Sequence, residues 1–172
     1  MGNRDSISIL DFLVDRIEVG IFAVDSEMRV VLWNHFMAMH SGKSPQEIIG
    51  RNLFECFPEL PRKWLEKKIR SVFVLKNYSF TSWEQRPYLF RFFHNRPVTG
   101  GVEAMQQSCT FLPIQNAKEE VEKVCVTVFD YTDTAIYQKR LTDAIDQLHQ
   151  EKLEQHRLIV QLQEAQDALQ KL

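Results

Sequence analysis

The sequence predicts an α+β fold, in which an antiparallel sheet carries helices on one face and a single long helix follows. Short apolar runs with strand-like alternation, separated by amphipathic helical segments, predict the sheet and its helices. The composition changes near Thr132. All 12 Phe, three Trp and six Pro precede residue 134, whereas residues 134–172 contain no Pro, Gly, Phe or Trp. The first region can therefore build a core, and the second is typical of one exposed helix.

Size and charge restrict the classes of function. A chain of 172 residues suits one globular domain with an appendage. Its 21 basic and 23 acidic side chains give a formal charge of −2, and no Lys/Arg cluster offers a footprint for nucleic acid or an anionic membrane. No apolar run has the length of a membrane span and no signal peptide is visible. We therefore expect a cytoplasmic protein without membrane insertion.

Cysteine and histidine spacing predicts neither a metal cage nor a catalytic site. Cys56, Cys109 and Cys125 have no C-x-x-C spacing, and the five histidines do not cluster with them. In a reducing compartment such cysteines behave as small buried hydrophobes. An enzyme would need Cys109 or Cys125 with His94, but both cysteines lie in apolar strand patterns where thiols are usually inert. We expect this chain not to be an enzyme.

The N-terminal part is predicted to contain a helix and a hairpin. Apolar residues from Ile7 to Ile17 recur at helical spacing, which predicts a cap helix over residues 1–18. Residues 20–25 and 29–34 are short apolar strands, and the turn residues between them predict a hairpin.

Helices and then strands are expected after this hairpin. Ser44-Pro45-Gln46-Glu47 is a strong helix start, with a serine N-cap, proline at the first position and glutamate at the third. Another amphipathic helix is predicted from residue 62 to 76. Three further strands are predicted over residues 78–84, 105–114 and 121–130, with a turn at 116–120.

Three segments carry a resemblance to a known family. Gly20–Asp25 with Val31–Asn34 is similar to its opening hairpin, Gly42–Arg51 to its "G-x-s-p-e-e-x-x-G" stretch, and Asp130-Tyr131-Thr132 to the D-x-T that ends its last strand. In this order they resemble the PAS family over roughly residues 8–133. The resemblance implies a five-stranded antiparallel sheet, with a sensor domain at 19–133 between the cap helix and a signalling helix at 134–172.

Asp130 and Thr132 are predicted to relay a signal. They stand where the last strand meets the long helix and can accept hydrogen bonds from unpaired backbone donors there. A simple helix cap is the alternative interpretation. Asn34, directly after a strand, is expected to be an N-cap for the next helix.

The sequence departs from the family pattern in two places. An insert from Pro87 to Glu103, rich in aromatic and basic residues, puts the alignment of the third strand in doubt. Gly50–Cys56 resembles the start of the flavin-binding light-sensing subfamily, but Leu53 stands where the photoreactive cysteine would be. A leucine cannot act as the nucleophile, so a flavin cysteinyl adduct is disfavoured.

The resemblance implies a small cavity between sheet and helices, whose ligand stays unknown. Its candidate lining is Trp33, Phe36, Met39, Phe54, Phe73, Phe80, Trp83, Phe90, His94 and Met105. The alternative is that these aromatic side chains simply fill the core. Because some PAS sensors bind haem through one histidine, haem is a possible cofactor, with His40 or His94 as axial ligand. The helix that usually carries this ligand, predicted over 62–76, contains no histidine.

The long helix carries a heptad pattern. Alternating steps of three and four residues give a seam of 12 positions, nine of them apolar. The apolar members are Tyr137, Leu141, Ala144, Leu148, Leu158, Leu162, Ala165, Leu169 and Leu172. A rival seam keeps the leucines at 141, 148, 162 and 169 but uses Ile145, Lys152, Ile159 and Gln166. Two similar registers with a polar middle near Glu151 and Gln155 suggest a rotational switch, and a static stalk is the alternative.

These observations lead to one functional hypothesis. We expect a sensor of a small ligand or partner that forms a homodimer, through a parallel coiled coil and the cap helix, and signals to an output domain in cis. The chain ends without a helix stop signal, so we expect it to be truncated before that domain. The sequence of residues 162–172 favours a diguanylate cyclase, which would make cyclic di-GMP, in a bacterial protein. A histidine kinase sensor and a ligand-free PAS scaffold that binds partners are the alternatives.

Overall fold

The computed structural model describes residues 2–93 and 102–170, with side chains from residue 9 onward. The chain divides into two compact units, of which the first ends at Thr132 and the second begins with Asp133. The division falls one residue before the boundary expected from the sequence. Each unit is described by itself.

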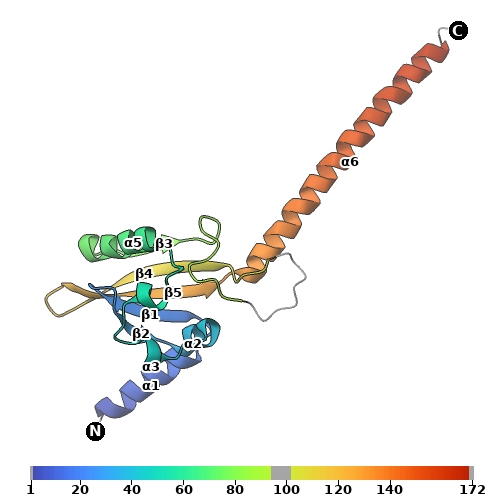
Figure 1. Cartoon of the computed structure of the whole chain (residues 1–172). Coiled ribbons are helices and arrows are strands. Elements are labelled where there is room, and N and C mark those ends of the chain that lie inside the picture. Colours follow the sequence, from blue (N-terminus) through green and yellow to red (C-terminus); the bar gives the residue numbers. More distant parts are fainter. Residues whose placement is uncertain (1, 94–101, 171–172) are drawn as a thin grey trace. The chain divides into compact units, whose positions relative to one another are not determined.

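Among its described residues the first unit contains five strands and five helices, and it has the predicted α+β class (Figure 1). An N-terminal helix is followed by a hairpin, four helices and three more strands. The elements are α1 Gly2–Arg16, β1 Gly20–Asp25, β2 Val30–Trp33, α2 His35–Ser41, α3 Pro45–Ile48, α4 Leu53–Cys56, α5 Arg62–Leu75, β3 Ser79–Thr81, β4 Gln107–Gln115 and β5 Val121–Asp130. This order confirms the predicted succession of helices and strands.

The strands form one antiparallel sheet in the order β2-β1-β5-β4-β3. The last strand therefore lies in the middle, with Val126 of β5 opposite Phe22 of β1 and Phe111 of β4. The predicted turn at 116–120 is confirmed, because Asn116 Oδ1 accepts the backbone N–H groups of Lys118 and Glu120. Because β5 is the central strand, other strands lie on both sides of it. Asp130 stands at its C-terminal end.

β3 is much shorter than the strand predicted over residues 78–84. The chain leaves the sheet after Thr81, because the backbone N–H groups of Gln85 and Arg86 both turn back to the Ser82 carbonyl. β4 also begins at Gln107 rather than at residue 105. Among the described residues between β3 and β4, Leu89, Phe90, Phe92 and Met105 fill part of the core.

One face of the sheet is buried under the helices. Val124, Val126 and Val128 alternate along β5 and are fully buried, together with Phe22 and Phe111 of the neighbouring strands. Helical residues complete the same core, among them Met37, Ile48, Leu65, Ile69 and Val72. The intervening residues of β5, such as Phe129, are more exposed. Alternation with period two thus separates a packed face from an open one.

Two helix starts follow the predicted capping chemistry. Asn34 Oδ1 accepts the Met37 N–H at 3.2 Å, which confirms the N-cap of α2. Ser44 and Glu47 form the predicted capping box at the start of α3. The Asn34 amide also donates to the carbonyls of Val14 and Val19 at 2.9 and 2.8 Å. It therefore fixes the end of α1 against β1 and α2.

The second unit is the greater part of α6, Thr132–Gln170, a continuous helix of 39 residues. The helix begins two residues before the predicted boundary at 134. Its large apolar side chains are exposed along its length, including Leu141, Leu148, Leu162 and Leu169. Within the described residues, no helix is both long and apolar enough to pass through a bilayer.

Candidate sensory site

An aromatic cluster occupies the interior between the sheet and the helices. The Phe90 ring lies 5.6 Å from Phe22, 5.9 Å from Trp33 and 5.2 Å from Phe57, measured between centroids, each with edge-to-face geometry. It stacks on Phe92 at 5.2 Å. Phe90 is 2% exposed and Phe22 is fully buried. Such rings fill space that a ligand would otherwise take.

A buried glutamine holds Phe90 in this position. Gln107 Oε1 accepts the N–H groups of Leu89 and Phe90, both at 3.0 Å, and its Nε2 donates to the Phe90 carbonyl at 2.7 Å. The Gln107 backbone N–H donates to the Pro87 carbonyl at 2.7 Å. Gln107 is 1% exposed, and pairing of its buried amide with backbone groups avoids a large desolvation cost. The first part of the predicted insert thus enters the core, through Leu89, Phe90 and Phe92.

The predicted pocket residues separate into several groups. Trp33, Phe54, Phe90 and Met105 are buried, and Phe36, Phe73 and Trp83 are half-buried. Met39 and Phe80 are 61% and 54% exposed. His94 lies outside the described residues. The structure brings Trp33 and Phe90 into contact, whereas Phe80 stands on the open face of the sheet.

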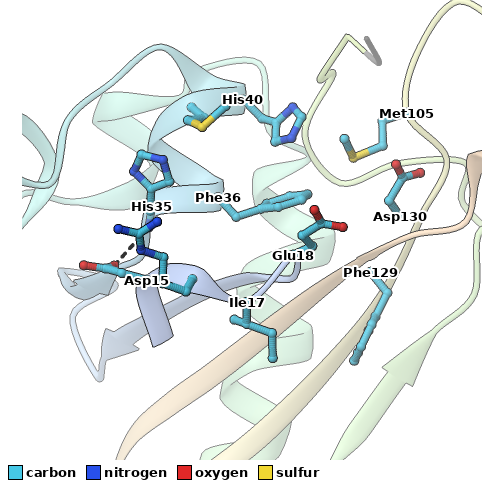
Figure 2. Close-up of a pocket in the computed structure, with 11 residues that line it drawn as sticks. Asp15, Ile17, Glu18, His35, Phe36, His40, Met105, Phe129 and Asp130 are labelled. Carbon is cyan, nitrogen blue, oxygen red and sulfur yellow. Dashed lines mark hydrogen bonds between the residues drawn. The ribbon is translucent and has the colours of Figure 1, made fainter. Parts of the chain in front are cut away.

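A groove of about 550 Å³ lies between the end of α1, helix α2 and the end of β5 (Figure 2). Its apolar lining is Ile17, Phe36, Met39, Met105 and Phe129. Its polar lining is Asp15, Arg16, Glu18, His35, His40 and Asp130. Three candidate pocket residues, Phe36, Met39 and Met105, therefore line this groove. None of the five rings of the interior cluster does so.

Sequence reasoning missed Asp15, Glu18 and Phe129 as site residues. Isolated acidic residues at the end of an amphipathic helix are typical of a solvated surface, and Phe129 lies in an ordinary strand pattern. These residues line one groove because the end of α1, helix α2 and the end of β5 meet there. One contact in this packing is the hydrogen bond from the His35 backbone N–H to Asp15 Oδ1, at 3.2 Å.

His40 forms one wall of the groove and is held on both sides. Its ring centroid lies 4.3 Å from that of Phe36 and 5.7 Å from that of Phe92. Burial lowers the pKa of His40 below its ordinary value, and a hydrogen bond with the Phe93 backbone and the charge of Asp130 partly oppose that change. The imidazole is therefore mainly neutral near pH 7.

Asp130 and Thr132 connect the groove to the start of α6. Asp130 Oδ1 accepts the Thr132 backbone N–H at 2.8 Å, which caps the helix. The buried Thr132 Oγ1 accepts the Gln106 N–H at 3.0 Å, and the Tyr131 N–H donates to the Gln106 carbonyl at 2.7 Å. These bonds fix the last strand to the segment that carries Met105.

The comparisons with known proteins agree with this geometry. The PAS fold profile matches residues 9–105, more than half of the chain. The chain belongs to the PAS family. A sensory box sensor histidine kinase from Vibrio cholerae is 28% identical, with a TM-score of 0.53 over 74% of this chain and 94% of that one. A search of curated proteins gives no match.

Two further solved structures share the fold at lower identity. The PAS domain of Bordetella pertussis BvgS is 19% identical, with a TM-score of 0.55 over 84% of this chain and 99% of that one. An RNA-binding Light-Oxygen-Voltage receptor is 18% identical, with a TM-score of 0.56 over 84% of this chain and 38% of that one. At these identities the likeness extends to the PAS fold alone.

Cys109 and Cys125 lie in surroundings that disfavour the nucleophilic thiolate form. Burial raises the pKa of Cys109 to about 12 and also raises the pKa of Cys125. Cys109 is therefore a neutral thiol near pH 7. No group of three or more metal-ligating side chains occurs among the described residues. Of the two haem candidates, His40 stands in the groove wall and His94 is not described.

Proposed function

We propose that this PAS domain is the sensor and dimerisation module of a cytoplasmic bacterial signalling protein. Its signal passes through α6, as a parallel coiled coil, to an output domain in the same chain. The exposed apolar surface of α6 carries this proposal. Leu141, Leu148, Leu162 and Leu169 are 57–71% exposed in the single chain and belong to both heptad registers. A helix with such a surface is stabilised by a second copy.

Dimerisation of the whole chain tests the proposal. Leu148→Asp places a charge in both registers, whereas the matched variant Leu153→Asp changes an equally exposed leucine outside both. We expect sedimentation equilibrium to show a dimer whose Kd rises at least roughly tenfold in Leu148→Asp and stays nearly unchanged in Leu153→Asp. A monomer at tens of micromolar, or equal effects of the two substitutions, would contradict the proposal.

Disulfide cross-linking identifies the register. Ala144→Cys lies in the first seam, Ile145→Cys in the rival seam and Asp146→Cys outside both, in a background that carries Cys125→Ser. A static stalk cross-links through one of the first two positions only. Cross-linking at both, with the ratio changed by a ligand, supports the rotational switch.

The output domain has two candidates. The sequence of residues 162–172 supports a diguanylate cyclase, and the 28% identity to a sensor histidine kinase supports a kinase. Fusion of the chain in frame to each type of catalytic domain distinguishes them. The correct partner gives an activity, cyclic di-GMP synthesis or autophosphorylation, that depends on Leu148.

The contents of the interior distinguish a ligand sensor from a ligand-free scaffold. Of the ten side chains predicted to line the pocket, all but Phe80 stay our proposed ligand set, because Phe80 stands on the open face of the sheet. The packing of Phe90 against four other rings favours the scaffold. Native mass spectrometry and an absorbance spectrum of gently purified protein separate the two. A bound mass or a Soret band supports the sensor, and bare polypeptide supports the scaffold.

A further inference from the structure

The groove of Figure 2 has the volume of a small-molecule site and a mixed apolar and polar lining. Its volume of about 550 Å³ falls within the range of roughly 300–1,000 Å³ that is usual for such sites. Met105 is buried and Phe36 is half-buried, so the groove has an apolar floor. It is distinct from the interior space that Phe90 fills.

The charge of the lining is predominantly negative. Asp15, Glu18 and Asp130 supply three carboxylates against the single guanidinium of Arg16. Asp15 accepts a hydrogen bond from the His35 backbone at one side of the groove. Figure 2 shows the carboxylates of Glu18 and Asp130 facing the space that Phe36 and Met105 border. A carboxylate beside an aromatic ring favours a cation, which gains from both the charge and the ring face.

We propose that this groove binds a small organic cation, an ammonium or guanidinium group on an apolar body. Glu18 and Asp130 are its anionic partners, Phe36 provides the aromatic face, and Ile17 and Met105 contact the apolar body. The inference rests on the proposed sensor function, for which it names the class of ligand.

The site is connected to the start of α6 through Asp130. The carboxylate that lines the groove also accepts the Thr132 N–H at the first turn of α6. A cation bound to Asp130 draws electron density from its carboxylate and so weakens the hydrogen bond that the carboxylate accepts from Thr132. Binding therefore changes the stability of the cap by an electrostatic route.

His40 makes the binding depend on pH. As the pH falls below about 6.5, protonation adds a positive charge to the wall that faces Asp130, so affinity for a cation decreases. Other titratable and charged groups line this groove and the neighbouring hollow beside His40. They are Asp15, Arg16, Glu18, His35, Glu59 and Arg91.

Isothermal titration of the whole chain with three isosteric probes tests the inference. The probes are phenethylamine, phenethyl alcohol and phenylacetate, which share an aryl group and differ in charge. We expect the amine to bind at least roughly tenfold more tightly than the alcohol, and the carboxylate to bind least. Glu18→Gln weakens amine binding roughly fivefold, whereas Glu164→Gln on α6 has no effect. Circular dichroism checks that both variants fold.

Several outcomes would overturn the inference. They are absence of amine binding, equal binding of amine and alcohol, and an unchanged amine affinity in Glu18→Gln. Amine binding that disappears as the chain dimerises would assign the groove to a second copy instead. Sedimentation of the same samples keeps the two proposals separate. A dimer without amine binding overturns this inference alone, and a monomer that binds the amine overturns only the proposed dimeric relay.

Discussion

At the scale of single residues, His40 shows how surroundings set the chemistry of a side chain. Its ring lies between Phe36 and Phe92 and bonds to the Phe93 backbone. Burial disfavours the imidazolium more strongly than Asp130 favours it, so the pKa of His40 in the folded chain is lowered. The folded state thus binds fewer protons at this site than the unfolded state does.

This difference predicts a pH-dependent stability. A folded pKa below the unfolded value near 6.5 means that the stabilisation is complete above about pH 6.5 and is lost as the pH falls through the folded pKa. His40→Asn should remove this contribution, and His149→Asn, on exposed α6, should leave it intact. Urea unfolding between pH 5 and 8 measures the slope. An unchanged slope in His40→Asn would assign it to other groups.

At the scale of elements, the segment from Pro87 to Phe93 shows that aromatic residues close together in the sequence can have different structural roles. The sequence marks it as an insert, and its charged and aromatic composition is compatible with a surface loop. In the structure, Gln107 on β4 pairs with its backbone and directs Phe90 into the core. Phe93, three residues later, is 71% exposed. Two phenylalanines of one segment therefore have opposite roles.

These opposite roles predict a large difference between two identical substitutions. Phe90→Ala removes a ring that contacts four others, and we expect it to lower the free energy of unfolding by roughly 3–5 kcal/mol. Phe93→Ala should cost less than about 1 kcal/mol, because its side chain is largely solvated. Chemical denaturation measures both. Similar losses for the two variants would show that Phe90 does not fill the core as described.

At the scale of the whole molecule, two side chains, Asp130 and Thr132, make hydrogen bonds where β5 ends and α6 begins. Thr132 lies at the end of the first unit and is fully buried, and its hydroxyl accepts the Gln106 N–H. Asp130 lines the groove and caps the same residue. These bonds lie where β5 meets α6, and a signal relay through them stays our proposal.

Removal of the Thr132 hydroxyl tests this assignment. Thr132→Val keeps the shape but leaves the half-buried Gln106 N–H without this partner, so we expect a loss of about 1–2 kcal/mol. Amide hydrogen exchange should become faster at Gln106 and in the first turn of α6. Thr134→Val on the same helix is the control. Unchanged amide exchange in Thr132→Val would show that the Thr132 hydroxyl has no influence on its surroundings and would contradict the relay.

Local and periodic features of this protein could be predicted from the sequence. The strand alternation of β5, the Asn34 cap, the Ser44–Glu47 capping box and the length of α6 depend on neighbours within a few positions, so their patterns are visible in the chain itself. The order of these elements predicted the α+β class, and the resemblance of three segments to the PAS family implied the PAS fold. The polar middle of the seam near Glu151 was visible in the same way.

Only the tertiary structure decided which side chains meet. Phe90 enters the core because of an amide 17 positions away on β4, and the groove joins Glu18, Phe36 and Asp130 from distant parts of the sequence. No local pattern encodes such contacts, because their energies arise only when folding places the end of α1, helix α2 and the end of β5 side by side. The sequence by itself therefore determined the fold of this PAS domain, and packing decided which side chains line the groove.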